Sequence, residues 1–265
     1  MMWLSYADSP RNTIPLEEAR SAICYPPMYA TYCSELIEKL RRAGITGLIS
    51  YGDTLIGGVK VLGRGHAAVV VAALHRDLGL VAVKIRRFDS KRHSLEDEAK
   101  FLRLCEKTRC VPRVYAWGRD FVIRELIPGP TLRKVLEEGG RDEVRRALTS
   151  LLVCAHRLDL LGVEVTEISL PLTQVVYRGG DTGRPVIVDL ESARLNPSAT
   201  NVTSVLGFVI GRSFRGTPIR SLMGIEKYVN TLRELARSYK RCGASRSCRT
   251  AIFSKITAVL SLAPG

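Results

Sequence analysis

The sequence has no apolar run approaching the roughly 18 residues that a membrane span needs. Its first twenty residues lack the basic segment and apolar stretch of a secretory signal peptide. We therefore expect a cytoplasmic protein with no membrane partner. Aromatic residues make up only 6% of the chain, and no zinc-finger spacing is present. Both absences argue against a dedicated nucleic-acid module that stacks bases on aromatic rings.

The seven cysteines form no Cys-x-x-Cys pair. Cys105 and Cys110, like Cys242 and Cys248, are spaced too loosely for the common zinc sites. Buried free thiols are the expectation. Disulfides are the alternative, which applies in the cytosol of hyperthermophiles. An odd number leaves at least one cysteine unpaired.

A strong excess of positive charge is present instead. There are 40 Lys and Arg against 26 Asp and Glu, a net charge of +14 over 265 residues. This length suits one large domain or two small ones. A positive field attracts phosphate groups on nucleotides or RNA, and also acidic proteins. The alternative is a basic surface that only contacts solvent.

The hydrophobic period changes along the chain. Residues 15–50 have helical spacing, and 57–85 contain three short β-branched runs typical of antiparallel strands. One helix and two strands follow, and then Ile-Pro-Gly-Pro interrupts the pattern at 127–130. The remainder predicts helices around one hairpin at 173–194, with a basic helical tail from 201.

This order predicts an α+β fold with the layout of a two-lobed kinase, in which the nucleotide binds between the lobes. The expected parts are an N-terminal helical extension (1–55), an N-terminal lobe with an antiparallel sheet and one helix (56–126), and a reduced, mostly helical C-terminal lobe (127–265).

A glycine pair stands between two of the predicted strands. Gly63 and Gly65 lie in Gly-Arg-Gly-His-Ala-Ala (63–68), and Val70 follows five residues after Gly65. A glycine loop between strands can place backbone N–H groups over phosphates. His66 adds a donor at the tip, or is simply an exposed loop histidine. The third glycine of the usual kinase pattern is replaced by Ala68, and an ordinary tight turn is the alternative.

A lysine ends the next strand, in Val-Ala-Val-Lys at Lys84. Kinases use a lysine in this place to reach the α and β phosphates, held by a carboxylate on the next helix. Glu98 in Glu-Asp-Glu-Ala-Lys-Phe-Leu is the expected partner, and Glu96 is the rival. The alternative is a surface lysine and a surface glutamate on unrelated elements.

Two further segments fit a nucleotide site. The run from Glu125 to Ile127 ends an apolar strand and would offer backbone groups to an adenine edge. Asp189 follows a β-rich run in Val-Ile-Val-Asp-Leu-Glu, where kinases hold Mg²⁺. Glu191 stands where a glycine is usual, and we do not count it as a ligand.

The catalytic loop is the least regular segment. His156, Arg157 and Asp159 resemble the kinase motif, but they lie in a long amphipathic helix, and the asparagine expected at 164 is a glutamate. Glu167 and Gln174 are better candidates, for orienting the acceptor hydroxyl and for binding metal. Each is one methylene longer than the usual Asp or Asn, and a displacement of about 1 Å can cost about a hundredfold in rate.

Six segments between about residues 58 and 194 together resemble a small archaeal protein-kinase-like family, related to RIO-type and other minimal atypical kinases. The resemblance implies ATP and Mg²⁺ as cofactors, a protein substrate, catalytic roles for Lys84, Asp189 and Glu167, and metal ligation by Asp189 and Gln174. The implied nucleotide contacts are Gly63, Gly65, His66, Val70, Ala82, Lys84, Glu98, Glu125 and Ile127. No activation segment of normal length is present, so a conventional peptide-binding subdomain is not expected.

The sequence therefore predicts an atypical serine/threonine protein kinase. The alternative is a nucleotide-binding pseudokinase scaffold, which the departures at Glu167 and Gln174 favour. Contact with RNA or ribosomes through the basic surface is compatible with either function.

Overall fold

The computed structural model describes residues 13–26 and 30–262. The chain forms two compact units. Unit 1 comprises Met1–Arg103 and Pro112–Ile127, and unit 2 comprises Leu104–Val111 and Pro128–Gly265. Both helices and antiparallel strands are present, so the α+β class is confirmed.

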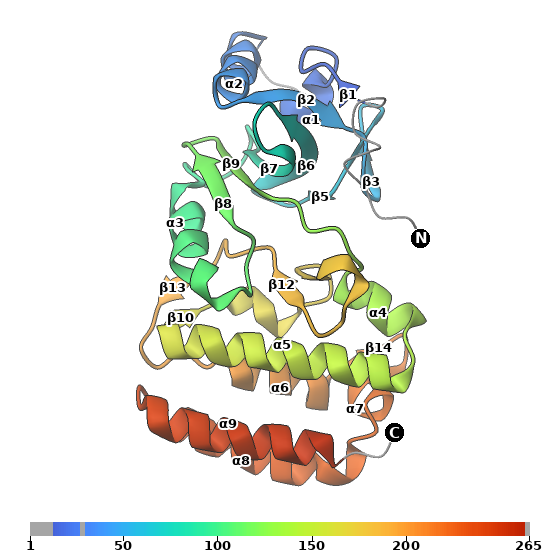
Figure 1. Ribbon diagram of the computed structural model, residues 1–265, viewed down its shortest axis with the longest axis vertical. Helices are drawn as coiled ribbons and strands as arrows, with labels where there is room; N and C mark the ends of the chain where they lie inside the picture. The colour runs from blue at the N-terminus through green and yellow to red at the C-terminus, as the bar shows by residue number, and fades with distance from the viewer. Residues whose placement is uncertain (1–12, 27–29, 263–265) are drawn as a thin grey trace. The chain divides into compact units, whose positions relative to one another are not determined.

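Unit 1 is built on an antiparallel sheet of order β1-β2-β6-β7-β9-β8, with β5 also paired to β6 (Figure 1). Its strands are β1 (Thr13–Ile14), β2 (Ile45–Ile49), β5 (Gly63–Arg64), β6 (Ala68–His75), β7 (Gly79–Arg86), β8 (Val114–Trp117) and β9 (Phe121–Glu125), with a separate hairpin of β3 (Thr54–Ile56) and β4 (Val59–Val61). Its helices are α1 (Arg20–Ile23), α2 (Ala30–Arg42) and α3 (Glu96–Cys105), of which the last two residues belong to unit 2.

Alternation along the central strands divides the sheet into two faces. Val69 and Val71 of β6, with Val81 and Val83 of β7, are buried in one core with the apolar residues of α1 and α2. The other set of alternate residues, which includes Lys84, lies on what we call the front face. Figure 1 shows α2 beside the sheet strands in unit 1.

One prediction for the N-terminal segment is wrong. Ile45–Ile49 lies in the stretch expected to be helical, but it forms β2 and pairs antiparallel with β6. Helix α2 ends at Arg42, and Gly44 then adopts a φ of +95° that favours glycine. The described residues before position 55 thus share unit 1 with the sheet, and the two units do not divide at residue 55.

Unit 2 is mainly helical. Its helices are α4 (Leu132–Glu138), α5 (Arg141–Leu161), α6 (Asn201–Gly211), α7 (Ile219–Leu222), α8 (Val229–Arg241) and α9 (Arg246–Ser261). Its strand pairs are β10 (Val163–Glu164) with β13 (Arg194–Leu195), β11 (Val175–Tyr177) with β12 (Pro185–Ile187), and β14 (Ser213–Phe214) with β15 (Thr217–Pro218). Its short 3₁₀ helices are η3 (Glu106–Thr108), η4 (Thr166–Ser169), η5 (Arg178–Gly180) and η6 (Glu226–Tyr228). Helix α5 contacts α4, α6 and α9, and the predicted hairpin and helical tail are confirmed (Figure 1).

The expectation of free thiols is wrong for six of the seven cysteines. The disulfides are Cys24–Cys33, Cys110–Cys154 and Cys242–Cys248. The remaining thiol, Cys105, is buried, and burial raises its pKa to about 12. The partners are 9, 44 and 6 residues apart. The fold, rather than a recognisable spacing, brings them together.

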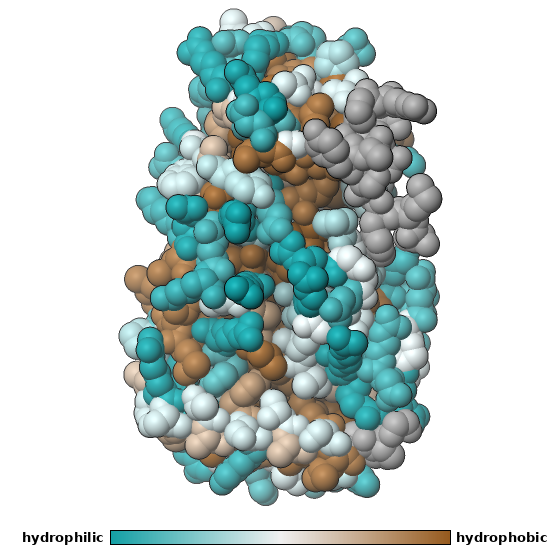
Figure 2. All heavy atoms as spheres, viewed as in Figure 1, coloured by the Kyte–Doolittle hydropathy of each residue, from teal (hydrophilic) through white to brown (hydrophobic). Residues whose placement is uncertain are grey.

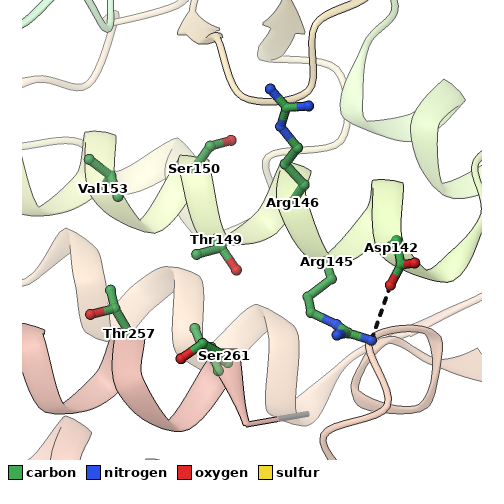
Figure 3. A pocket seen from close by; sticks show the side chains of 9 residues that line it. Asp142, Arg145, Arg146, Thr149, Ser150, Val153, Thr257 and Ser261 are labelled. Atoms are coloured by element: carbon green, nitrogen blue, oxygen red, sulfur yellow. Dashed lines mark ion pairs between the residues drawn. The ribbon is translucent and has the colours of Figure 1, made fainter. Parts of the chain in front are cut away.

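Within residues 13–26 and 30–262, no helix combines the length and apolar composition that crossing a bilayer requires. On the face drawn in Figure 2, hydrophilic side chains are spread over both units, with apolar atoms between them.

Candidate functional site

A buried ion pair lies on the front face of the unit 1 sheet. Strand β7 carries Lys84 and helix α3 carries Glu98, and the Lys84 Nζ to Glu98 Oε2 distance is 2.7 Å. Their side chains are only 5% and 1% exposed. The other carboxylate oxygen of Glu98 lies 3.8 Å from Arg124 Nη1. The predicted pairing is confirmed, and two cations compensate the buried carboxylate.

The front face continues from this pair as an apolar surface. Lys84 lies opposite Val70 of β6 and Val122 of β9 in the sheet register, and Ala82 lies opposite Ala72. The apolar residues are the buried Ile49, Ala72, Ala82 and Leu126, with the partly buried Tyr51, Leu62, Val70 and Leu80 packed against them. Val70 and Ala82 therefore share one apolar surface next to a charged pair. Such a surface suits a ligand with a flat apolar part and an anionic part.

The glycine pair lies at the β5–β6 hairpin. Gly63 pairs with Val70 in the sheet, and the Gly65 N–H donates to the Ala68 carbonyl at 2.9 Å. Arg87 donates to the Gly65 carbonyl at 2.8 Å, and His66 is exposed at the tip, as expected. A Cβ on Gly63 would meet no atom within 4 Å, and one on Gly65 only the Ala68 oxygen at 3.6 Å. The fold of the chain therefore does not require glycine at either position.

The last two predicted nucleotide contacts, Glu125 and Ile127, lie at the end of β9 and just after it. The Glu125 N–H donates to the Arg113 carbonyl at 2.8 Å, and its carboxylate accepts from the Arg113 N–H at 3.3 Å. Glu125 is thus engaged by Arg113, the residue before β8. The backbone N–H and carbonyl of Ile127 have no hydrogen bond to any residue that the structure describes. Of the two residues, Ile127 offers backbone groups to a ligand.

Unit 2 gathers the predicted metal ligands at one end of the β11–β12 hairpin. The Val188 N–H donates to the Gln174 carbonyl at 2.8 Å, which places Gln174 beside the residue that precedes Asp189. Asp189 Oδ1 accepts from the Glu191 N–H at 3.1 Å, and oxygens of the two carboxylates lie within 4.8 Å. Gln174 Oε1 is buried and accepts no hydrogen bond within the described chain. Carboxylate and amide oxygens suit a hard cation such as Mg²⁺, so these residues fit the metal.

The predicted acceptor-orienting residue lies in the same unit. Glu167 is part of η4, and its Oε2 accepts a hydrogen bond from the Ser192 hydroxyl. Ser192 Oγ in turn accepts from the Thr166 N–H at 3.0 Å. Ser192 therefore joins Glu167 to the segment after Asp189. Sequence patterns did not single out this serine, although its position three residues after Asp189 was an available signal.

The motif rejected as a catalytic loop is structural. His156 and Asp159 both lie in α5 and are buried. Asp159 accepts hydrogen bonds from the Asn201 backbone and side chain at 2.7 and 2.8 Å, at the start of α6. His156 Nδ1 lies 2.8 Å from the Tyr239 hydroxyl. Burial raises the pKa of Asp159 to about 7, whereas burial and the nearby Arg249 lower the pKa of His156 to about 4.

Unit 1 thus brings together a glycine hairpin, an apolar sheet surface and the Lys84–Glu98 pair, while unit 2 brings together Glu167, Gln174 and Asp189. This grouping comes from the geometry of each unit alone. No protein-family model matches the chain, and no curated protein matches it.

Proposed function

We propose that this protein is an ATP- and Mg²⁺-dependent phosphotransferase, an atypical serine/threonine protein kinase with a bilobal protein-kinase-like fold and a reduced C-terminal lobe. The observation that carries the proposal is the Lys84–Glu98 ion pair at 2.7 Å, buried on an apolar sheet face. Removing the carboxylate of such a buried pair costs about 3–5 kcal/mol, so the position of the pair is strongly fixed. A fixed lysine beside an apolar surface is suited to hold the phosphates of a nucleotide.

Unit 1 would bind the nucleotide. The adenine ring would lie against the surface of Val70 and Ala82, with its edge at the backbone of Ile127. The phosphates would lie under the Gly63–Gly65 hairpin, where the missing side chains leave the backbone accessible. Lys84 would donate to phosphate oxygens, and Glu98 would hold its ammonium in position. Positioning and charge neutralisation account for most of the rate enhancement in phosphoryl transfer.

Unit 2 would supply the groups for transfer. Asp189 and Gln174 would hold Mg²⁺, which when bound neutralises phosphate charge. Glu167 would orient the acceptor hydroxyl and accept its proton. A carboxylate that orients a hydroxyl must itself be held in place. Ser192 supports this role because it bridges Glu167 Oε2 and the Thr166 N–H.

A nucleotide-binding scaffold is the second candidate. The longer side chains at 167 and 174 favour it. They would move the acceptor-orienting carboxylate and the metal-binding amide while leaving the unit 1 surface intact. A scaffold would therefore bind ATP without transferring phosphate.

The experiment measures ATP binding and transfer of the labelled γ-phosphoryl group to the protein itself and to a generic basic protein. The variants are Lys84→Ala and Asp189→Ala, and the matched controls are the exposed Lys100→Ala and Asp53→Ala. We expect transfer in the wild type and both controls, and its loss in both site variants. ATP binding without transfer would establish the scaffold. Absence of ATP binding in the folded wild type would refute both functions.

A further inference from the structure

Most of the net positive charge lies in the last quarter of the chain. From Asn201 onward there are eleven Lys and Arg but only two acidic residues, Glu226 and Glu234. This excess is nine of the net fourteen positive charges of the protein. The proposed phosphotransfer site does not use it, because that site's residues in unit 2 lie between 167 and 192.

Helix α8 displays this charge along one face. Its buried residues Leu232 and Tyr239 face the protein interior, and the helix packs against α6 and α9. Arg233, Arg237 and Lys240 are exposed and recur at intervals of four and three residues. This spacing places them on one side of the helix, with successive steps of about 6 and 4.5 Å along its axis.

The turn after α8 leads to a fourth exposed cation, Arg246. The Cys242–Cys248 disulfide closes the corner between α8 and α9. Ser245 Oγ accepts the Cys248 N–H at 3.4 Å and caps the start of α9. Arg246, the first residue of α9, is therefore held at this corner and is exposed.

These four exposed cations lack the ion-pair partners that several other cations of unit 2 have. Arg146, Arg194 and Arg215 form ion pairs with Asp181, Glu164 and Glu137 at 2.9, 2.7 and 2.9 Å. By contrast, Arg233, Arg237, Lys240 and Arg246 make no ion pair with any residue in the described chain, and Glu234 is the sole acidic residue of α8. Their charge is available to an external anion.

We propose that the face of α8 formed by Arg233, Arg237 and Lys240, together with Arg246, binds the phosphate backbone of RNA. A row of regularly spaced cations complements a polyanion. Between residues 229 and 261 no large apolar side chain is exposed, so the surface has neither the wedge that inserts into a membrane nor a ring that stacks on bases. The exposed Asn230, on the same helix face, adds an amide that can pair with a 2′-hydroxyl. This inference does not depend on the proposed kinase function.

The test measures binding of the full chain to an RNA hairpin of about 16 base pairs, the length that known duplex-RNA domains span, as a function of salt. Four phosphate contacts predict a slope of log K against log salt near −3.6, or about a 150-fold loss between 50 and 200 mM salt. The test variant is Arg233→Gln/Arg237→Gln/Lys240→Gln. The control, Lys60→Gln/Lys91→Gln/Lys107→Gln, removes the same charge from exposed lysines elsewhere.

We expect the α8 variant to bind at least tenfold more weakly at 50 mM salt, with a slope closer to zero by about 2.7, while the control retains at least half the wild-type affinity. Unchanged thermal melting of both variants shows that the fold is intact. Four results would overturn the proposal: no binding at 50 mM salt, equal weakening by the control, tighter binding to a DNA duplex of the same length, or tighter binding to anionic phospholipid vesicles.

Discussion

Replacing Glu98 should destabilise unit 1 more than replacing Lys84. Glu98 is 1% exposed, with Lys84 at 2.7 Å and Arg124 at 3.8 Å, and both of these side chains are only 5% exposed. Glu98→Leu leaves two buried cations without their shared carboxylate, which we expect to cost about 3–5 kcal/mol. Lys84→Met leaves the carboxylate next to Arg124, so the cost should be smaller, about 1–3 kcal/mol.

The double variant Lys84→Met/Glu98→Leu, compared with the two single variants, gives the interaction energy of the Lys84–Glu98 ion pair. It removes both buried charges, so it should be more stable than Glu98→Leu alone, with a coupling energy of about 0.5–3 kcal/mol. Urea unfolding is followed by the fluorescence of Trp117, which lies in β8 of unit 1, in a Trp3→Phe background. Equal stability of Glu98→Leu and the wild type would refute the reasoning, since it would mean that neither cation needs the carboxylate of Glu98.

Four further predictions concern other elements. The free energy of unfolding of Gly65→Ala should lie within about 0.5 kcal/mol of the wild-type value, because the new Cβ has room. The same variant should bind ATP more weakly in a titration. The double variant Cys110→Ser/Cys154→Ser should lose about 4 kcal/mol of stability in urea, since the disulfide closes a loop over a separation of 44 residues. His156→Gln should show stability that falls as pH rises from about 4 to 7, because the raised pKa of Asp159 makes the folded state bind more protons there than the unfolded state. Asp159→Asn should show the opposite slope between about pH 4 and 6.5, from the lowered pKa of His156, and a flat profile in either variant would contradict the pKa shifts.

Local sequence patterns were sufficient for most of the individual elements. The short β-branched runs within Ala68–His75 and Gly79–Arg86 predicted the central hairpin, because such residues pack well on a sheet. Apolar residues at helical spacing likewise placed His156 and Asp159 within a helix, α5, rather than in a catalytic loop. Lys84 and Glu98 were predictable as a pair because their segments resemble those of kinases, in which a strand lysine is held by a carboxylate on the helix that follows.

Contacts between distant segments were decided by tertiary structure. Ile45–Ile49 follows a helix in a stretch of helical character, and it became a strand because β6 offered an unpaired edge beside it. The disulfides followed the same rule, since Cys110 and Cys154 approach each other only once α5 packs against the segment that carries Cys110. The Ser192–Glu167 hydrogen bond joins residues 25 apart and had no local signature. The sequence by itself determined the type of most elements and the chemistry of their side chains, because these depend on neighbours along the chain. Pairing across the fold, and with it the strand at Ile45–Ile49, depends on which surfaces burial brings together.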